Sequence, residues 1–320
     1  MTMKMHTGHN KWETTTKPKN SDDVLQLCQD IERTMQGFAR PTITTLTMTQ
    51  VQTNVPLTER TAFLAADRYE IKWGVHEPTN TLWIRGYQGQ PFAVAVCELM
   101  GQAANYCHTC NRCTPGVAYH GGLQRFGRSL YAPKLAIACK QESPLRSSFV
   151  LEFEHHHTGQ DGPSQAVADY FSSPTVQCVV FVKVYAATHQ YETLRTMQIG
   201  AVMFTRAKGE TSVHVSAAYD LGSEPLSNAR KATFAASAAC HETDHVWIRK
   251  PLHLHSEDAD PIVTFPDGSP TMNVPFKLLV GGRVGEDKPE DFVIDLGLGI
   301  QEFCYCVAHY SKDLFDEKSE

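Results

Sequence analysis

A strand, turn, helix and strand pattern between residues 147 and 185 constrains the fold more than any other stretch. The pattern reads SSFVLEFEHHHTGQDGPSQAVADYFSSPTVQCVVFVKVY. Alternation over 149–154 directs Glu152 and Glu154 to one face of a predicted strand. Residues 179–185 are apolar and β-branched apart from Lys183, which is typical of a strand covered on both faces. These features predict an α/β (α+β) fold with a central mixed sheet flanked by helices.

Two carboxylates on one face of a central strand are costly to bury unless a cation pairs with them. A metal ion or a lysine is the usual partner, and Lys183 in the neighbouring apolar run is available for that role. Glu152, Glu154 and Lys183 are therefore the first candidate catalytic residues. The alternative is that both glutamates face solvent on an edge strand and that Lys183 forms a structural salt bridge with one of them.

The composition excludes several classes of protein. The chain has 320 residues, 42% of them hydrophobic, and a net charge of -6, which argues for a substantial core and against a surface coated in positive charge. No apolar run approaches the roughly 20 residues that cross a bilayer. The N-terminus lacks the apolar stretch of a secretory signal. Without such a signal, the ten cysteines of the chain indicate reduced thiols. We expect an intracellular protein of the cytoplasm or nucleus without a membrane partner.

The sequence predicts three regions along the chain. Residues 1–20 are polar and aperiodic, which predicts a disordered tail. Residues 21–68 contain a capped helix over 21–37 and then a Thr- and Pro-containing arm. Residues 69–320 are expected to form a single α/β domain.

Further elements are predicted inside this domain from periodicity and turn signals. They are a hairpin over 69–85, a helix over 92–106, a cysteine-rich loop over 107–121, strands near 134–138, 194–205 and 212–218, a helix near 226–240, strand-like runs at 277–282 and 292–296, and a final helix over 300–309. In the central unit, Asp161 and Pro163 suit the start of a helix.

This arrangement resembles the core of the PD-(D/E)xK nuclease superfamily, and within it a set of uncharacterised fungal proteins related to bacterial restriction endonucleases. The resemblance is carried by GRS (127–129) with APK (132–134), by LEFE (151–154), by the capped helix with VVFVKV (179–184), and by NVPFKLLVGGR (273–283) with DFVIDL (291–296). It implies a restriction-endonuclease-like core with N- and C-terminal extensions.

The resemblance also implies Mg²⁺-dependent phosphodiester hydrolysis of nucleic acid. In the family, an Asp after a Pro and a Glu of the following strand bind Mg²⁺, which polarises the phosphate and lowers the pKa of a bound water. A lysine orients that water. Carried over by position, Glu152 is the metal ligand, Glu154 stands in the place of the lysine, and Lys183 is a migrated lysine.

One position departs from the family pattern. Lys134 follows Pro133 where the family has Asp, and a cation there repels a divalent metal. Three explanations remain open: a shifted local alignment, substitution by Glu98 of the preceding helix, or lost catalysis. If catalysis is lost, the chain is a non-enzymatic interaction or scaffold protein that keeps the fold to bind protein or nucleic acid.

Two further groups of residues are candidate sites. Cys107, Cys110 and Cys113 have zinc-like spacing, with His120 as the fourth ligand, although reduced and partly buried cysteines are the alternative. Four basic residues would line the approach to Glu152 and hold a phosphate backbone, with a solvated charged face as the alternative. They are Arg125, Arg128, Lys134 and Lys140.

Overall fold

The computed structural model describes the parts of the chain given by these ranges: residues 3–6, 11–14, 49–52, 72–76, 81–85, 90–113, 117–120, 124–127, 129–131, 133–139, 146–155, 164–185, 196–235, 246–255, 262–280 and 289–316. The chain divides into two compact units, Met1–Gly89 with Gly122–Ala132 and Gln90–Gly121 with Pro133–Glu320. The first division falls at Gly89, whereas the sequence predicts one near residue 69.

The first unit is made of short antiparallel strands. Its five-stranded sheet has the order β3-β5-β4-β8-β7, with bounds Thr49–Gln52 (β3), Lys72–His76 (β4), Thr81–Arg85 (β5), Gln124–Phe126 (β7) and Ser129–Tyr131 (β8). The pairing of β4 with β5 confirms the predicted hairpin. β1 (Met3–His6) and β2 (Lys11–Thr14) pair where the sequence predicts a disordered tail. The predicted helix over 21–37 lies outside the described residues.

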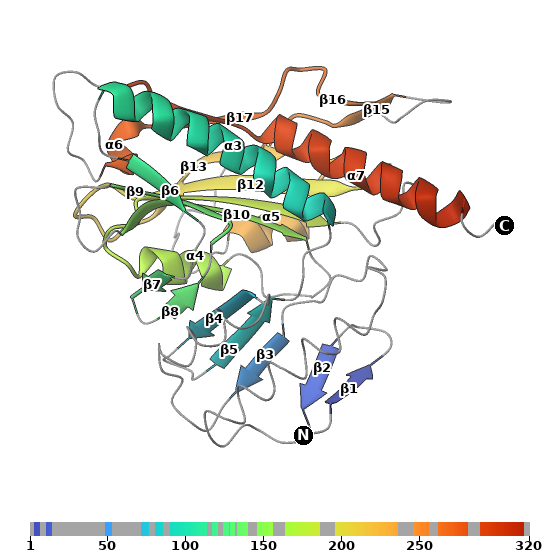
Figure 1. Cartoon of the computed structure of the whole chain (residues 1–320), viewed down its shortest axis with the longest axis horizontal. Helices are drawn as coiled ribbons and strands as arrows, with labels where there is room; N and C mark the ends of the chain where they lie inside the picture. The colour runs from blue at the N-terminus through green and yellow to red at the C-terminus, as the bar shows by residue number, and fades with distance from the viewer. Residues whose placement is uncertain are drawn as a thin grey trace. The chain divides into compact units, whose positions relative to one another are not determined.

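The second unit is an α/β domain built on a seven-stranded mixed sheet (Figure 1). The strand order is β14-β13-β12-β11-β10-β9-β6. The bounds are Val117–His120 (β6), Leu135–Cys139 (β9), Ser147–His155 (β10), Cys178–Tyr185 (β11), Gln198–Thr205 (β12), His214–Asp220 (β13) and Ile248–Arg249 (β14). β10 with β11 and β13 with β14 are parallel, and the other pairs are antiparallel. The α/β class expected from the sequence is confirmed.

The parallel pair β10 and β11 is the predicted strand, helix and strand unit. Parallel neighbouring strands need a crossover connection. The helix α4 (Ser164–Phe171) lies in the connection between β10 and β11. Every residue of β11 is buried, as its apolar sequence predicts for a strand covered on both faces.

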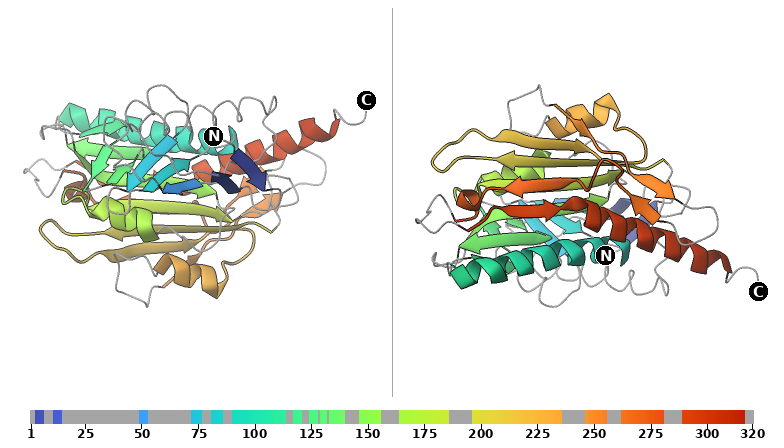
Figure 2. Two further views of the ribbon diagram at one scale, coloured as in Figure 1. Left: turned by 90° about the horizontal axis from the view of Figure 1, so that it is seen from below. Right: turned by 90° about the horizontal axis from the view of Figure 1, so that it is seen from above.

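Helices cover both faces of this sheet. α3 (Gln90–Cys113) and α7 (Leu296–Asp316) lie on one face, and α4 and α5 (Asn228–Ala235) lie on the other (Figures 1 and 2). The side of α3 and α7 also holds the hairpin of β17 (Thr271–Val274) and β18 (Phe292–Asp295), whose buried residues belong to the same core cluster. A further two-stranded sheet is formed by β15 (His253–His255) and β16 (Ile262–Thr264).

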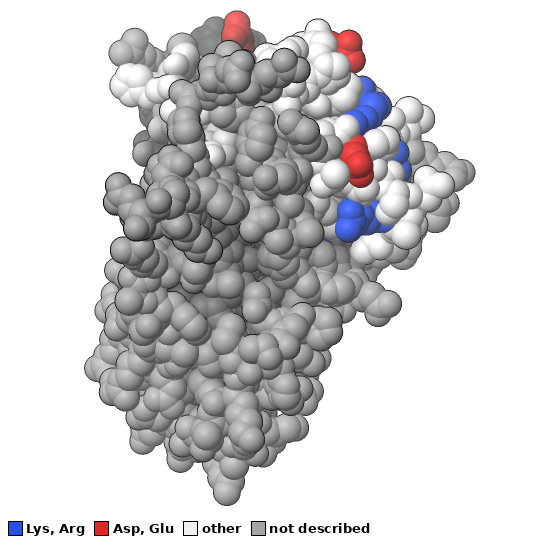
Figure 3. Space-filling model, turned by 90° about the vertical axis from the view of Figure 1, so that its right-hand side faces the viewer, with Lys and Arg blue, Asp and Glu red and all other residues white. Residues whose placement is uncertain are grey.

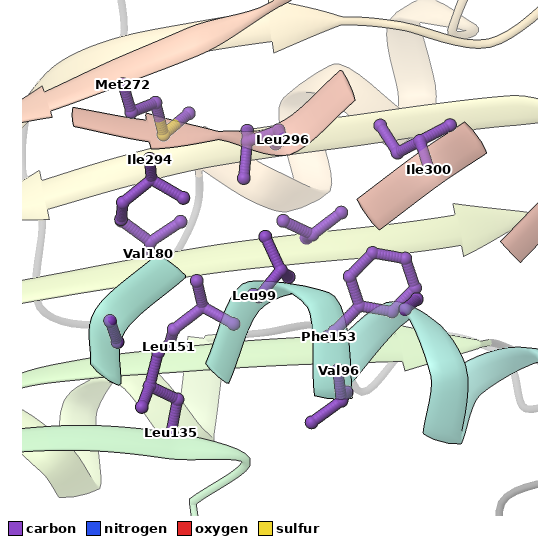
Figure 4. Close-up of a cluster of buried hydrophobic side chains, with 14 of the residues drawn as sticks. Val96, Leu99, Leu135, Leu151, Phe153, Val180, Met272, Ile294, Leu296 and Ile300 are labelled. Atoms are coloured by element: carbon purple, nitrogen blue, oxygen red, sulfur yellow. The ribbon is translucent and has the colours of Figure 1, made fainter. Parts of the chain in front are cut away.

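The main core lies between the sheet and the layer of α3 and α7. Alternate residues of the strands enter it and meet the apolar stripes of both helices, as Figure 4 shows for Leu99, Leu151 and Ile300. Gln102 ties α3 to the start of α7: its Nε2 donates to the Asp295 carbonyl at 3.1 Å, and its Oε1 accepts from the Asp295 amide at 2.9 Å. This pair of bonds satisfies a backbone donor and acceptor at the junction of β18 and α7.

Three boundaries differ from those predicted. α3 continues to Cys113, so the loop predicted from residue 107 is wrong, because Cys107 and Cys110 extend the buried stripe of Ala103 at helical spacing. The strand-like run predicted at 277–282 begins as the short helix α6 (Phe276–Leu279), and β17 pairs with β18 in the hairpin instead. α7 is longer than 300–309. Among the described residues, no helix has the length and apolar character needed to cross a membrane.

Gly222 stands where two backbone segments approach closely. A Cβ there would lie 2.2 Å from the Met197 carbonyl oxygen and 2.6 Å from the Gln198 Cα. We expect Gly222→Ala to lower the free energy of unfolding by about 1–3 kcal/mol in urea denaturation. Gly101→Ala is the control, because a Cβ there meets nothing within 4 Å and alanine favours the helix by about 0.5–1 kcal/mol. Destabilisation of equal size in both variants would contradict this explanation.

Candidate functional site

Glu152 is fully buried in the interior of the sheet. It lies on β10, between β9 and β11, and its exposed fraction is 0%. The alternative of solvated edge carboxylates is therefore wrong for Glu152. Its Oε1 accepts a hydrogen bond from the hydroxyl of Tyr170.

The helix α4 brings Tyr170 to this carboxylate. Val167, Tyr170 and Phe171 are buried and recur at i, i+3 and i+4, which is the apolar stripe of an amphipathic helix packed on a sheet. The phenol hydroxyl is the polar end of that stripe, and the buried acid gives it the partner that a buried tyrosine needs.

Lys183 shares the face of Glu152. In the parallel register, Glu152 is level with Phe181 and Glu154 is level with Lys183. Level positions on neighbouring strands carry their side chains on the same face, and every second residue returns to that face, so Glu152 and Lys183 share one face of two adjoining strands. The Lys183 side chain is 3% exposed, and its Nζ lies 5.4 Å from the centroid of the Tyr185 ring. The side chain of Glu154 lies outside the described residues.

Lys134 lies in a bend directly before β9, the other neighbour of β10. The antiparallel register pairs Val150 with Ala136 and Leu151 with Leu135, the residue after Lys134. The Lys134 side chain is 3% exposed. Contact with a phosphate backbone needs an exposure that Lys134 lacks, so this residue does not fit the predicted basic rim.

Of the other residues of the predicted rim, only the side chain of Arg125 is described. Arg125 is exposed and belongs to the first compact unit, whereas Glu152 belongs to the second. Arg128 and Lys140 lie outside the described residues.

The groups beside Glu152 do not fit a Mg²⁺ ion. Mg²⁺ takes oxygen ligands in near-octahedral geometry, whereas a phenol bonds this carboxylate and the buried Lys183 stands on the neighbouring strand β11. Glu98 is no substitute, because α3 covers the opposite face of the sheet, where Glu98 Oε1 accepts from Gln102 Nε2 at 3.2 Å. In the described part of the chain, no group of three or more His, Cys, Asp or Glu residues is arranged to hold a metal ion.

The predicted zinc ligands lie on α3. Cys107 and Cys110 are 4% and 3% exposed and belong to the core cluster. This agrees with the alternative to a zinc site, in which the cysteines are reduced and buried. Burial and a hydrogen bond with Cys110 raise the pKa of Tyr106 well above its usual range. The side chains of Cys113 and His120 lie outside the described residues.

Arg206 forms a buried cluster that the sequence did not indicate. Its guanidinium donates to three backbone carbonyl oxygens at the end of α4, those of Phe171 at 2.7 Å, Ser173 at 2.6 Å and Val176 at 2.7 Å. Helix C-termini leave such carbonyls without intrahelical donors. Arg206 therefore fixes the turn that connects α4 to β11.

Asp220 is a second buried acid that the sequence did not indicate. It is 1% exposed, and it accepts from Arg249 at 2.8 Å, from Lys231 at 3.0 Å and from the Leu226 amide at 3.0 Å. A single Asp at the end of a strand carries no signal of these partners, because they come from α5, β14 and a turn. The arrangement joins three elements at one edge of the sheet and has the character of a structural network.

Comparison with protein-family models found no match, and a search of curated proteins found none either.

Proposed function

We propose that this chain is a catalytically inactive protein with a PD-(D/E)xK nuclease-like core, and that it acts by binding a partner. The observation that carries the proposal is the burial of Lys134 at the position where the nuclease family has a metal-binding Asp. A lysine in place of that Asp brings a positive charge instead of a carboxylate ligand, and it repels a divalent ion. The ancestral metal site would thus have become part of the protein's interior.

Closure of the Glu152 face supports this proposal. A nuclease needs an open position where a metal-bound water and a scissile phosphate meet. Glu152 is fully buried, Lys134 and Lys183 are each 3% exposed, and Tyr170 occupies one carboxylate oxygen. These groups suit a satisfied polar cluster better than a hydrolytic centre.

A protein partner fits the described surface better than nucleic acid does. On the face in Figure 3, the described Lys and Arg residues are interspersed with Asp and Glu, whereas a phosphate backbone favours a continuous basic field. Large apolar side chains are also exposed, and such residues favour protein contacts. They are Val246, Ile248, Val293, Leu298 and Tyr305.

The second candidate function is Mg²⁺-dependent phosphodiester hydrolysis. The observation in its favour is that Glu152 and Lys183 occupy one face of adjoining strands, as the nuclease resemblance implies. In this case, the Lys134 side chain would have to move away from its buried position, and Glu154 would have to help bind the metal.

A plasmid-nicking assay separates the two candidates. With Mg²⁺ or Mn²⁺ and supercoiled DNA, or with labelled single-stranded RNA, we expect the wild-type protein to cleave no more than buffer does. Glu152→Gln is the matched variant, because it keeps the size of the side chain and its acceptor oxygen for Tyr170. Circular dichroism establishes that both proteins are folded.

Metal-dependent cleavage that is lost in Glu152→Gln would overturn the proposal and establish the nuclease. Cleavage that persists in Glu152→Gln would indicate a contaminating nuclease, and repeating the assay after a further purification step decides that case. Lys134→Asp restores the family residue, and if the fold is nuclease-derived, we expect this variant to gain Mg²⁺ binding in calorimetry.

A further inference from the structure

The strands β15 and β16 present two histidines on one exposed face. His253 is level with Thr264, and Leu254 is level with Val263. Val263 belongs to the core cluster, and Leu254 packs against it. Since successive side chains of a strand alternate, His253 and His255 both point away from that core, and both are exposed.

The two imidazoles are neighbours, and one of them is held by a hydrogen bond. Their ring centroids lie 6.4 Å apart with an interplanar angle of 46°. Nε2 of His255 lies 2.7 Å from the hydroxyl oxygen of Thr264. When Nε2 donates its proton to that hydroxyl, Nδ1 holds the lone pair, and the ring orientation is fixed. Metal-binding histidines are typically oriented in this way through their second nitrogen.

We propose that His253 and His255 form a two-imidazole site for a divalent transition metal such as Zn²⁺ or Cu²⁺. Imidazole nitrogen is a preferred ligand of both ions, with Zn–N distances of about 2.0–2.1 Å. The His253 side chain is exposed, so its ring can rotate about χ1 and χ2 to meet an ion held by the oriented ring of His255.

Among the described residues, no third His, Cys, Asp or Glu completes a group with the pair. The backbone pairing of β15 with β16 holds the two Cα positions before any ion binds, which reduces the entropy cost of binding. The histidine pair lies on β15, whereas Glu152 lies on β10, so this proposal does not depend on the proposed function.

The test titrates Zn²⁺ alone into the untagged full chain by isothermal titration calorimetry. The chain has fifteen histidines, so the informative quantity is the difference between variants. We expect His253→Gln/His255→Gln to lose one equivalent of bound Zn²⁺, and each single variant to bind that equivalent at least about tenfold more weakly. Thr264→Val removes the orienting hydroxyl, and we expect it to weaken binding by about tenfold.

His214→Gln is the matched control, because His214 is an exposed histidine on β13 and is expected to leave the titration unchanged. Electron paramagnetic resonance with one equivalent of Cu²⁺ gives a direct readout, since two coordinating imidazoles give nitrogen hyperfine structure that the double variant loses. Absence of Zn²⁺ and Cu²⁺ binding by the wild type, or equal binding by the double variant with an unchanged unfolding midpoint, would overturn the proposal.

Discussion

Glu152→Ala is expected to lower the free energy of unfolding by about 3–5 kcal/mol, the cost of removing one member of a buried charged group. Glu152 is fully buried, Lys183 on the same face of the adjoining strand is 3% exposed, and Lys134 directly before β9 is also 3% exposed. Without the Glu152 carboxylate, the positive charge of the buried lysines is no longer balanced, and the Tyr170 hydroxyl loses its hydrogen-bond acceptor. Urea unfolding followed by circular dichroism at pH 7 measures the difference.

Two matched variants separate the charge from the hydrogen bond. Tyr170→Phe removes only the donor to Glu152 and is expected to cost about 1.5–3 kcal/mol, the range for hydrogen bonds to charged groups. Glu302→Ala removes an exposed glutamate of α7 and is expected to change stability by less than about 0.5 kcal/mol. If Glu152→Ala resembled Glu302→Ala, the carboxylate would not be part of a buried cluster.

Double-mutant cycles identify the lysine that compensates Glu152. Replacing a whole buried charge pair with apolar residues of similar size is often neutral, so Glu152→Leu with Lys134→Met is expected to be more stable than the sum of the single effects predicts. The same cycle with Lys183→Met measures the coupling of the other lysine. The larger coupling energy marks the dominant partner.

Arg206→Ala is expected to cost about 3–5 kcal/mol, because it leaves carbonyl groups buried without a donor. Arg206 donates to the carbonyls of Phe171, Ser173 and Val176, and its guanidinium carbon lies 5.2 Å from the centroid of the Phe171 ring. Burial lowers the pKa of Arg206, but an arginine remains charged at neutral pH. Urea unfolding again gives the free energy.

Arg206→Lys is the informative control for this cluster. Lysine keeps the charge but lacks the planar fork that reaches several carbonyls at once, so we expect it to recover less than half of the lost stability. Hydrogen exchange should become faster first in the turn between α4 and β11. Full recovery by lysine would show that the charge, rather than the geometry of the donors, stabilises this turn.

The elements with strong periodicity could be predicted from the sequence. β10, α4 and β11 are present as expected, because the alternation over 149–154 and the apolar run over 179–185 are local signals of burial. The end of α3 was missed although Cys107 and Cys110 continue the helical spacing of its buried stripe, whereas the helix α6 depends on a contact that is distant in the sequence. Asp291 illustrates this: its Oδ1 accepts from the Phe276 amide at the start of α6, 15 residues earlier in the chain.

The site was predictable only in part, for a similar reason. Two neighbouring strands predict that Glu152 and Lys183 share a face, because side chains alternate with a fixed period. Burial of Lys134 was not predictable, since a lysine before a short strand is usually exposed. Tyr170 and Arg206 were missed because their partners lie 18 and 30 to 35 residues away, beyond the range of any local pattern.

The bonds between Gln102 and the backbone of Asp295 join residues 193 positions apart, and they have a consequence for biosynthesis. α3 leaves the ribosome long before α7. The apolar stripe of α3 and one side of the sheet therefore remain exposed to solvent until α7 emerges. Contacts of such long range form slowly and leave partly folded chains prone to aggregation. A nascent chain halted before Leu296 should therefore be held by chaperones, whereas one that has released α7 should not.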